Sequence, residues 1–178
     1  MGTPVAGDYW RNGDDLKFED SAGSRVTMWE GYGGIHAYDA NDEITITTAG
    51  IANKVQITTF DTDDAAVGTT PAHGSDHITI DIAGTFLVTA SVSIASAAAG
   101  GADEVGIAVF KNNGATLFEN LHAHRKLTGG FVDTGSVSIS GIVALAATDT
   151  VEMWLWNEDS TDNIVVDDIS LSVCRVGG

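Results

Sequence analysis

The chain has 178 residues, of which 43% are hydrophobic, so it is long enough to bury a core without disulfide or metal cross-links. Eight basic against 25 acidic residues give a formal net charge of -17, which disfavours binding to nucleic acids and to anionic membranes. We find no basic segment followed by an apolar run at the N-terminus and no stretch of about 18 apolar residues. We therefore expect no signal peptide and no membrane span, and a protein that stays in a cytoplasm or leaves it by assembly or lysis.

Residues 1–43 differ from the rest of the chain, and we interpret them as an arm that docks by contact. Two short alternating runs, 16–20 and 25–29, are joined by four residues that include a glycine, which predicts a β-hairpin. A lone hairpin is marginal in water, so this one must lie against another surface. A disordered leader is the alternative interpretation. The expected docking residues are the aromatic and apolar side chains of this segment: Tyr9, Trp10, Leu16, Phe18, Met28, Trp29 and Tyr32.

From residue 44 onward, short alternating runs separated by turn residues predict roughly eight strands and no amphipathic helix. The best-patterned run is 84–94, in which every second residue from Phe86 to Ile94 is apolar and only Leu87 is apolar on the other face. The sequence Lys-Asn-Asn-Gly at 111–114 predicts a tight hairpin turn. Many short strands with such turns are typical of an all-β sandwich or barrel.

Three stretches of the sequence resemble the C1q/tumour-necrosis-factor-like jelly roll. They are 78–91, with a strand, a glycine, an aromatic residue and a long alternating strand; the serine-rich run 136–145 followed by 149–156; and the apolar closing strand 164–173. The turn at 147–149 reads Ala-Thr-Asp where the family usually has a Gly-Asp pair. The resemblance implies an antiparallel jelly-roll β-sandwich over residues 44–178, and it implies a homotrimer.

Two tryptophans offer a physical reason for a trimer. Trp154 and Trp156 lie on the face of their strand opposite Met153 and Leu155, so a single core layer cannot hold all four side chains. We predict that the two tryptophans form the trimer interface, since exposed tryptophans are candidates for burial between subunits. The alternative is a strand buried on both faces inside one sandwich.

Few residues are candidates for binding a metal ion. His122 and His124 lie two apart and face the same side of a strand, so they are candidate metal ligands together with His73 and His77, although a solvated pair is the plainer interpretation. Acidic loops are candidate calcium sites but lack EF-hand spacing; they contain Asp61, Asp63, Asp64, Asp159, Asp162, Asp167 and Asp168.

No acid, base and nucleophile set stands out, and no glycine-rich phosphate loop opens a helix. We therefore expect no enzymatic activity and no cofactor. The one cysteine, Cys174, ends an apolar strand and is expected to be a small buried hydrophobe rather than a nucleophile.

The segment 10–25 is similar to short segments of bacteriophage virion proteins. Together with a C1q-like module, this similarity favours a trimeric decoration or cement protein on a phage capsid. Such a protein is assembled in the host cytoplasm, lies on the virion surface and contacts the major capsid protein or another virion protein. The alternative is a phage head- or tail-fibre tip that binds a host receptor or glycan through loops at one end of the sandwich, namely 95–104, 111–116 and 157–163. A bacterial C1q-like protein unconnected with a virus is a third interpretation.

Overall fold

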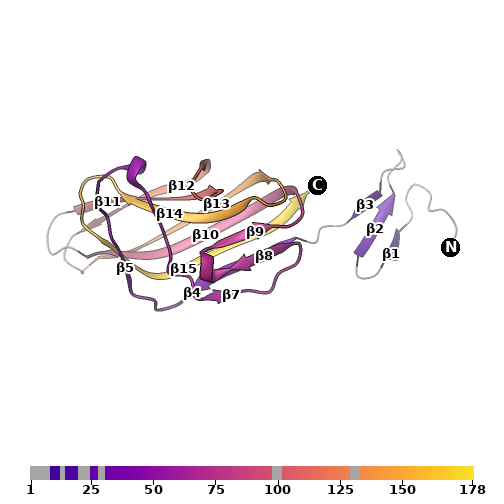
Figure 1. Cartoon of the computed structure of the whole chain (residues 1–178), viewed down its shortest axis with the longest axis horizontal. Coiled ribbons are helices and arrows are strands. Elements are labelled where there is room, and N and C mark those ends of the chain that lie inside the picture. The colour runs from indigo at the N-terminus through magenta and orange to yellow at the C-terminus, as the bar shows by residue number, and fades with distance from the viewer. Residues whose placement is uncertain (1–8, 13–14, 20–24, 28–30, 98–101, 129–132) are drawn as a thin grey trace.

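The computed structural model describes residues 9–12, 15–19, 25–27, 31–97, 102–128 and 133–178, without side chains for residues before 31. Two antiparallel six-stranded sheets form the body of the molecule, so the predicted all-β jelly-roll sandwich is confirmed (Figure 1). Within the described part of the chain, helix is limited to two short 3-10 turns, Ile51–Asn53 and His73–Ser75. None of the described helices is long and apolar enough to cross a membrane.

The first sheet has the strand order β13-β10-β15-β4-β7, and β5 also pairs with β15. Its strands are β4 (Tyr32–Ala37), β5 (Asp42–Ile44), β7 (Thr62–Asp63), β10 (Gly84–Ser96), β13 (Thr134–Leu145) and β15 (Ile164–Gly177). The second sheet has the order β12-β11-β14-β9-β8, and β6 also pairs with β14. Its strands are β6 (Val55–Gln56), β8 (Thr69–Ala72), β9 (His77–Ile80), β11 (Ala102–Lys111), β12 (Thr116–Thr128) and β14 (Thr150–Asn157).

Strand β10 is an interior strand of the first sheet, and its apolar face is buried in the core. It pairs with β13 along most of its length on one side and with β15 on the other. Every second side chain from Phe86 to Ile94 is buried, and these side chains meet those of Ile107 and Leu155 from the second sheet in one continuous core. Each fully buried side chain of this size contributes about 1.5–3 kcal/mol, so the interface between the two sheets is the main source of stability.

The N-terminal strands form a small sheet of their own. Strands β1 (Tyr9–Asn12), β2 (Asp15–Glu19) and β3 (Arg25–Thr27) are antiparallel, with β2 in the middle. The predicted hairpin between the second and third strands is confirmed, and β1 adds a strand that the sequence pattern did not predict. Of the expected docking residues, Met28 and Trp29 lie outside the described residues, and so do the side chains of Tyr9, Trp10, Leu16 and Phe18.

The boundary expected at residue 43 is wrong, because β4 and β5 belong to the sandwich. Strand β4 pairs with β15 through Gly33 opposite Val173, and β5 pairs with β15 through Ile44 opposite Ile164. Gly33 and Gly34 lie within β4. In the structure a Cβ at Gly33 would overlap the side chain of Thr69, so the residue is small because its strand packs closely.

Candidate functional sites on the two outer faces

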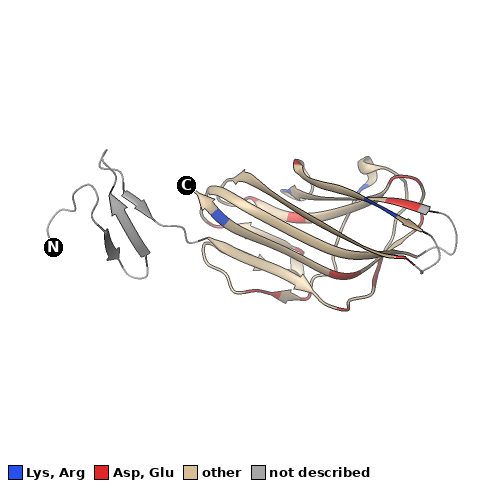
Figure 2. Ribbon diagram, turned by 180° about the vertical axis from the view of Figure 1, so that it is seen from behind, with Lys and Arg blue, Asp and Glu red and all other residues tan. Residues whose placement is uncertain are grey.

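The outer face of β10 and β13 in the first sheet is rich in hydroxyl groups and has no charged side chain. Strands β10 and β13 contain no charged residue, and seen from behind the long strands are tan over most of their length (Figure 2). Paired residues of neighbouring strands face the same side of a sheet. Two hydroxyl rows therefore run across β13, β10 and β15, and we call them the serine face: Ser138, Ser91 and Ser170, then Ser140, Thr89 and Ser172.

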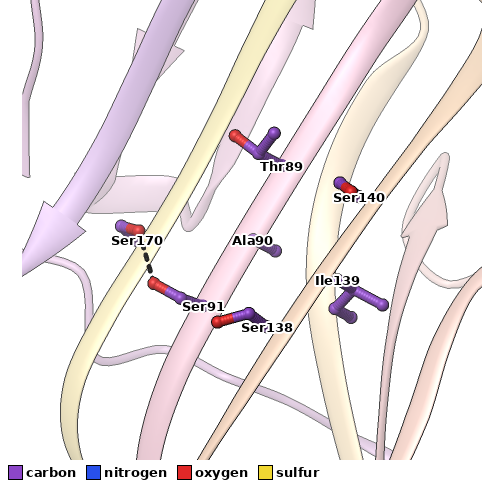
Figure 3. A pocket seen from close by; sticks show the side chains of 7 residues that line it. All are labelled: Thr89, Ala90, Ser91, Ser138, Ile139, Ser140 and Ser170. Carbon is purple, nitrogen blue, oxygen red and sulfur yellow. Dashed lines mark hydrogen bonds between the residues drawn. The ribbon is translucent and has the colours of Figure 1, made fainter.

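The serine face is shallowly hollowed, because its side chains are small. Figure 3 shows the hydroxyl groups of Ser91 and Ser170 directed at one another across β10 and β15, with their oxygens 2.9 Å apart. The surrounding hollow is lined by Thr89, Ala90, Ser91, Ser138, Ile139, Ser140 and Ser170. Such a surface permits close approach of another backbone and offers hydroxyl groups that can both donate and accept hydrogen bonds.

An apolar row lies beside the serine face on the same side of the sheet. Leu87 of β10 is opposite both Ile142 of β13 and Cys174 of β15, and Cys174 is opposite Tyr32 of β4. Ile142 is 61% exposed and Tyr32 is 45% exposed. We call these four residues the apolar row. Tyr32, which we had placed in the N-terminal arm, is thus part of the sandwich surface.

Cys174 is exposed, so our expectation of a buried cysteine is wrong. The apolar residues Leu171 and Val173 of the same strand are buried in the core. Because successive side chains of a strand alternate between faces, the residue after Val173 points outward. The alternation within the closing strand was sufficient to predict this placement.

The outer face of the second sheet carries a second, smaller apolar cluster. It consists of Ala108, Phe110 and Trp156, with Leu117 and Trp154 packed against it. The indole ring of Trp156 lies over Gly106, where a Cβ would overlap it. The Trp156 Nε1 donates a hydrogen bond to Glu158 Oε1 at 2.6 Å. The prediction that the tryptophans lie opposite the core-facing side chains is therefore confirmed.

The prediction that both tryptophans are exposed is wrong for Trp156, which is 1% exposed. Side chains of its own chain bury it, so the alternative of a strand covered on both faces within one subunit holds at this position. Trp154 is half-buried. The centroid of its ring lies 6.0 Å from the centroid of the Phe110 ring and 5.2 Å from Lys54 Nζ. Its part in a trimer interface stays a prediction.

The structure brings together only two of the four histidines considered as metal ligands. His122 and His124 of β12 meet with their Nε2 atoms 2.7 Å apart. His73 and His77 lie near β8 and β9, at the opposite edge of the same sheet. There, His73 Nδ1 lies 3.0 Å from Asp63 Oδ2, and His77 Nδ1 lies 2.9 Å from the carbonyl oxygen of Ser75.

Carboxylates in the candidate calcium loops have partners within the chain. Asp63 accepts a hydrogen bond from the backbone N–H of His73, which lowers the pKa of that carboxyl group. Asp64 lies 3.1 Å from His36 Nδ1, and Asp168 accepts a hydrogen bond from the backbone N–H of Asp39. Among the residues described, no group of three or more His, Cys, Asp or Glu side chains is arranged to hold a metal ion.

A buried carboxylate joins the strands at one end of the sandwich. Asp103 is 1% exposed and accepts hydrogen bonds from Ser96, Asn157 and Ser160. Burial raises the pKa of Asp103, but the three hydrogen bonds to its ionised form outweigh burial, so the pKa lies below its ordinary value. This network holds the loop after β14 against the start of β11.

The other end of the sandwich is held by a second carboxylate, Asp149. It accepts hydrogen bonds from Lys111 Nζ at 3.0 Å, from Asn112 Nδ2 at 2.9 Å and from the backbone N–H of Ala146 at 2.9 Å. Burial alone would raise the pKa of Asp149, whereas these bonds and the lysine charge lower it below its ordinary value. Thr148, in the turn that departs from the family pattern, has φ of 73°, a backbone conformation that favours glycine.

The three loops that we expected to form a receptor site do not share one end of the sandwich. Strand β11 runs from Ala102 to Lys111, so the loops 95–104 and 111–116 lie at its two opposite ends. The Asp103 network joins 157–163 to the first of these loops only. A single binding surface made of all three loops is therefore excluded by the strand order.

Comparisons with known proteins show the fold. No family model and no curated protein sequence matches the chain. Eiger TNF from S. frugiperda is similar with a TM-score of 0.54 and 8% identity, covering 84% of this chain and 94% of that one. The globular domain of zebrafish complement 1qA protein has a TM-score of 0.54 and 8% identity, covering 83% and 97%. Murine APRIL at pH 5.0 has a TM-score of 0.52 and 9% identity, covering 82% and 99%. The chain has the C1q/TNF-like jelly-roll fold that its sequence predicted.

Proposed function

We propose that this chain is a non-enzymatic structural module that forms a homotrimer and attaches to a phage capsid through residues 1–30. The observation that carries the proposal is the apolar row beside the serine face, whose β10 and β13 strands have no charged side chain. Ile142 and Leu87 form an apolar contact surface on strands without any charge, in a chain whose net charge is -17. Copies with so much negative charge repel one another unless they meet where the charge is absent.

The C1q/TNF-like fold supports this arrangement, since the resemblance implies a trimer. Small hydroxyl side chains let two backbones approach closely, and the exposed side chains of the apolar row supply area to bury at about 25 cal/mol per Å². The interface would therefore lie on the first sheet and not on the tryptophan face, where Trp156 is already buried.

The N-terminal segment supports attachment to a larger particle. Among the described residues, β1, β2 and β3 pair only with one another. Figure 1 shows the chain entering the sandwich at β4, at the same end as the C-terminus. In a threefold assembly all three N-terminal segments would leave at one end, where they can contact a shell together and bind more tightly than one segment alone.

Co-sedimentation with purified capsids tests the proposal. The full chain should bind to saturation, and a variant that lacks residues 1–30 should remain a trimer but lose at least tenfold in capsid affinity. Unchanged capsid binding by this variant would contradict the role of the segment. The deletion stops before Tyr32 because β4 belongs to the sandwich and must be retained.

A further inference from the structure

The two histidines of β12 form a pair whose ring nitrogens converge. His122 and His124 are two residues apart on the outer face of the strand, and their Nε2 atoms are 2.7 Å apart. Their rings meet edge to face, with centroids 4.7 Å apart and an interplanar angle of 79°. Without metal, one Nε2–H donates a hydrogen bond to the lone pair of the other Nε2, because two protonated nitrogens at this distance would repel each other.

A buried tryptophan holds the pair in place. In the strand register Gly106 lies opposite both His124 and Trp156, and the indole ring crosses β11 above this glycine. The His122 ring stacks on the Trp156 ring with an interplanar angle of 18°, and the His124 ring meets it edge-on at 85°. The two imidazoles therefore rest on a fixed apolar surface instead of moving freely in water.

Carboxylates surround the far side of His124. Glu104 Oε1 lies 3.2 Å from His124 Nδ1, and Glu158 Oε1 lies 4.0 Å from the same nitrogen. A carboxylate that accepts the Nδ1 proton fixes the tautomer whose Nε2 lone pair is free, which is the usual second contact of a metal-binding histidine. The two negative charges also favour a cation beside the pair.

We propose that His122 and His124 bind one divalent late transition-metal ion through their Nε2 atoms, with Cu²⁺ bound most tightly and water in the remaining positions. When the ion binds, the proton on the hydrogen-bonding Nε2 moves to Nδ1 of the same ring, so both Nε2 lone pairs are free for the metal. Two nitrogens bound at about 2.0 Å and at right angles to each other lie about 2.8 Å apart, close to the spacing seen here. A tetrahedral ion needs a spacing of about 3.3 Å, so Zn²⁺ requires the rings to separate. Imidazole ligands and the general order of divalent affinities likewise favour Cu²⁺ over Ni²⁺ and Zn²⁺.

Titration of the full chain with Cu²⁺, Ni²⁺ and Zn²⁺ near pH 7.5 tests this site, with calorimetry and tryptophan fluorescence as readouts. We expect one site per chain that binds Cu²⁺ most tightly, and quenching of Trp156 fluorescence by the bound ion. His122→Gln and His124→Gln should each lose at least tenfold in Cu²⁺ affinity. His77→Gln is the matched control and should bind Cu²⁺ as the parent chain does.

Electron paramagnetic resonance of the Cu²⁺ complex gives a second readout that does not depend on affinity. Two coordinated imidazole nitrogens support the shared site, and one or none overturns it. Equal Cu²⁺ binding by the parent chain and by the double variant His122→Gln/His124→Gln also overturns it, because the ion would then sit elsewhere. Thermal melting without metal checks that each variant is folded, so a lost signal can be assigned to lost ligands.

Discussion

The indole ring of Trp156 occupies the space above Gly106 that a side chain at position 106 would need. This relationship buries the tryptophan within its own chain and places the ring against the two histidines of β12. One glycine thus decides both the burial of a large aromatic side chain and the position of the histidine pair.

Replacing this glycine should destabilise the sandwich. Gly106→Ala forces the indole ring out of its place, and overpacking of this kind costs about 1–3 kcal/mol of unfolding free energy. Urea unfolding measures the effect. Gly74→Ala is the control, since a Cβ at Gly74 meets nothing within 4 Å. Equal stability of the two variants would contradict the packing described.

The turn between β13 and β14 offers a stabilising substitution. Thr148 has φ of 73°, which is unfavourable for a β-branched residue. Thr148→Gly should raise the unfolding free energy by about 1 kcal/mol, after allowance for the extra entropy of glycine in the unfolded chain. Thr116→Gly is the control, because Thr116 lies in β12 without a positive φ and should lose stability. A loss of stability in both variants would show that Thr148 is not strained.

Asp103 should make the free energy of unfolding depend on pH in the acid range. Because its folded-state pKa lies below its ordinary value, it contributes stability that is fully present above the unfolded pKa of about 3.9 and is lost as pH falls through the folded pKa. Asp103→Asn should cost about 1–3 kcal/mol at pH 7 and less at pH 3. Unfolding curves between pH 3 and 7 test this, with Asp159→Asn as the exposed control. Parallel pH profiles for the parent chain and Asp103→Asn would contradict the assignment.

Sequence patterns predicted the fold wherever one strand carried its own signal. The alternation of 84–94 identified β10 and its buried face. The spacing of two residues alone placed His122 and His124 on the same side of their strand. Strand β4 was not predicted, because Gly33 has no side chain to show an alternation of buried and exposed residues. A glycine is needed there because the Thr69 side chain occupies the space of a Cβ.

Features that depend on pairing between distant strands could not be predicted from the local sequence pattern. Burial of Trp156 requires Gly106 to be its neighbour across the sheet, which the register of β11 and β14 decides. The apolar row is likewise formed by single residues from separate strands, and Leu87 was the only one of them that stood out in its own strand. The ends at which the loops gather also depend on strand order and not on composition.

The solution mass of the full chain tests the central claim most directly. Sedimentation equilibrium should give three times the 18.5 kDa of one chain. Ile142→Glu introduces a charge into the apolar row and should shift the species to monomer. Ile82→Glu, at a residue that is 47% exposed outside the row, should leave the mass unchanged. A monomeric parent chain, or a trimer that Ile142→Glu leaves intact, would contradict assembly through the outer face of the first sheet.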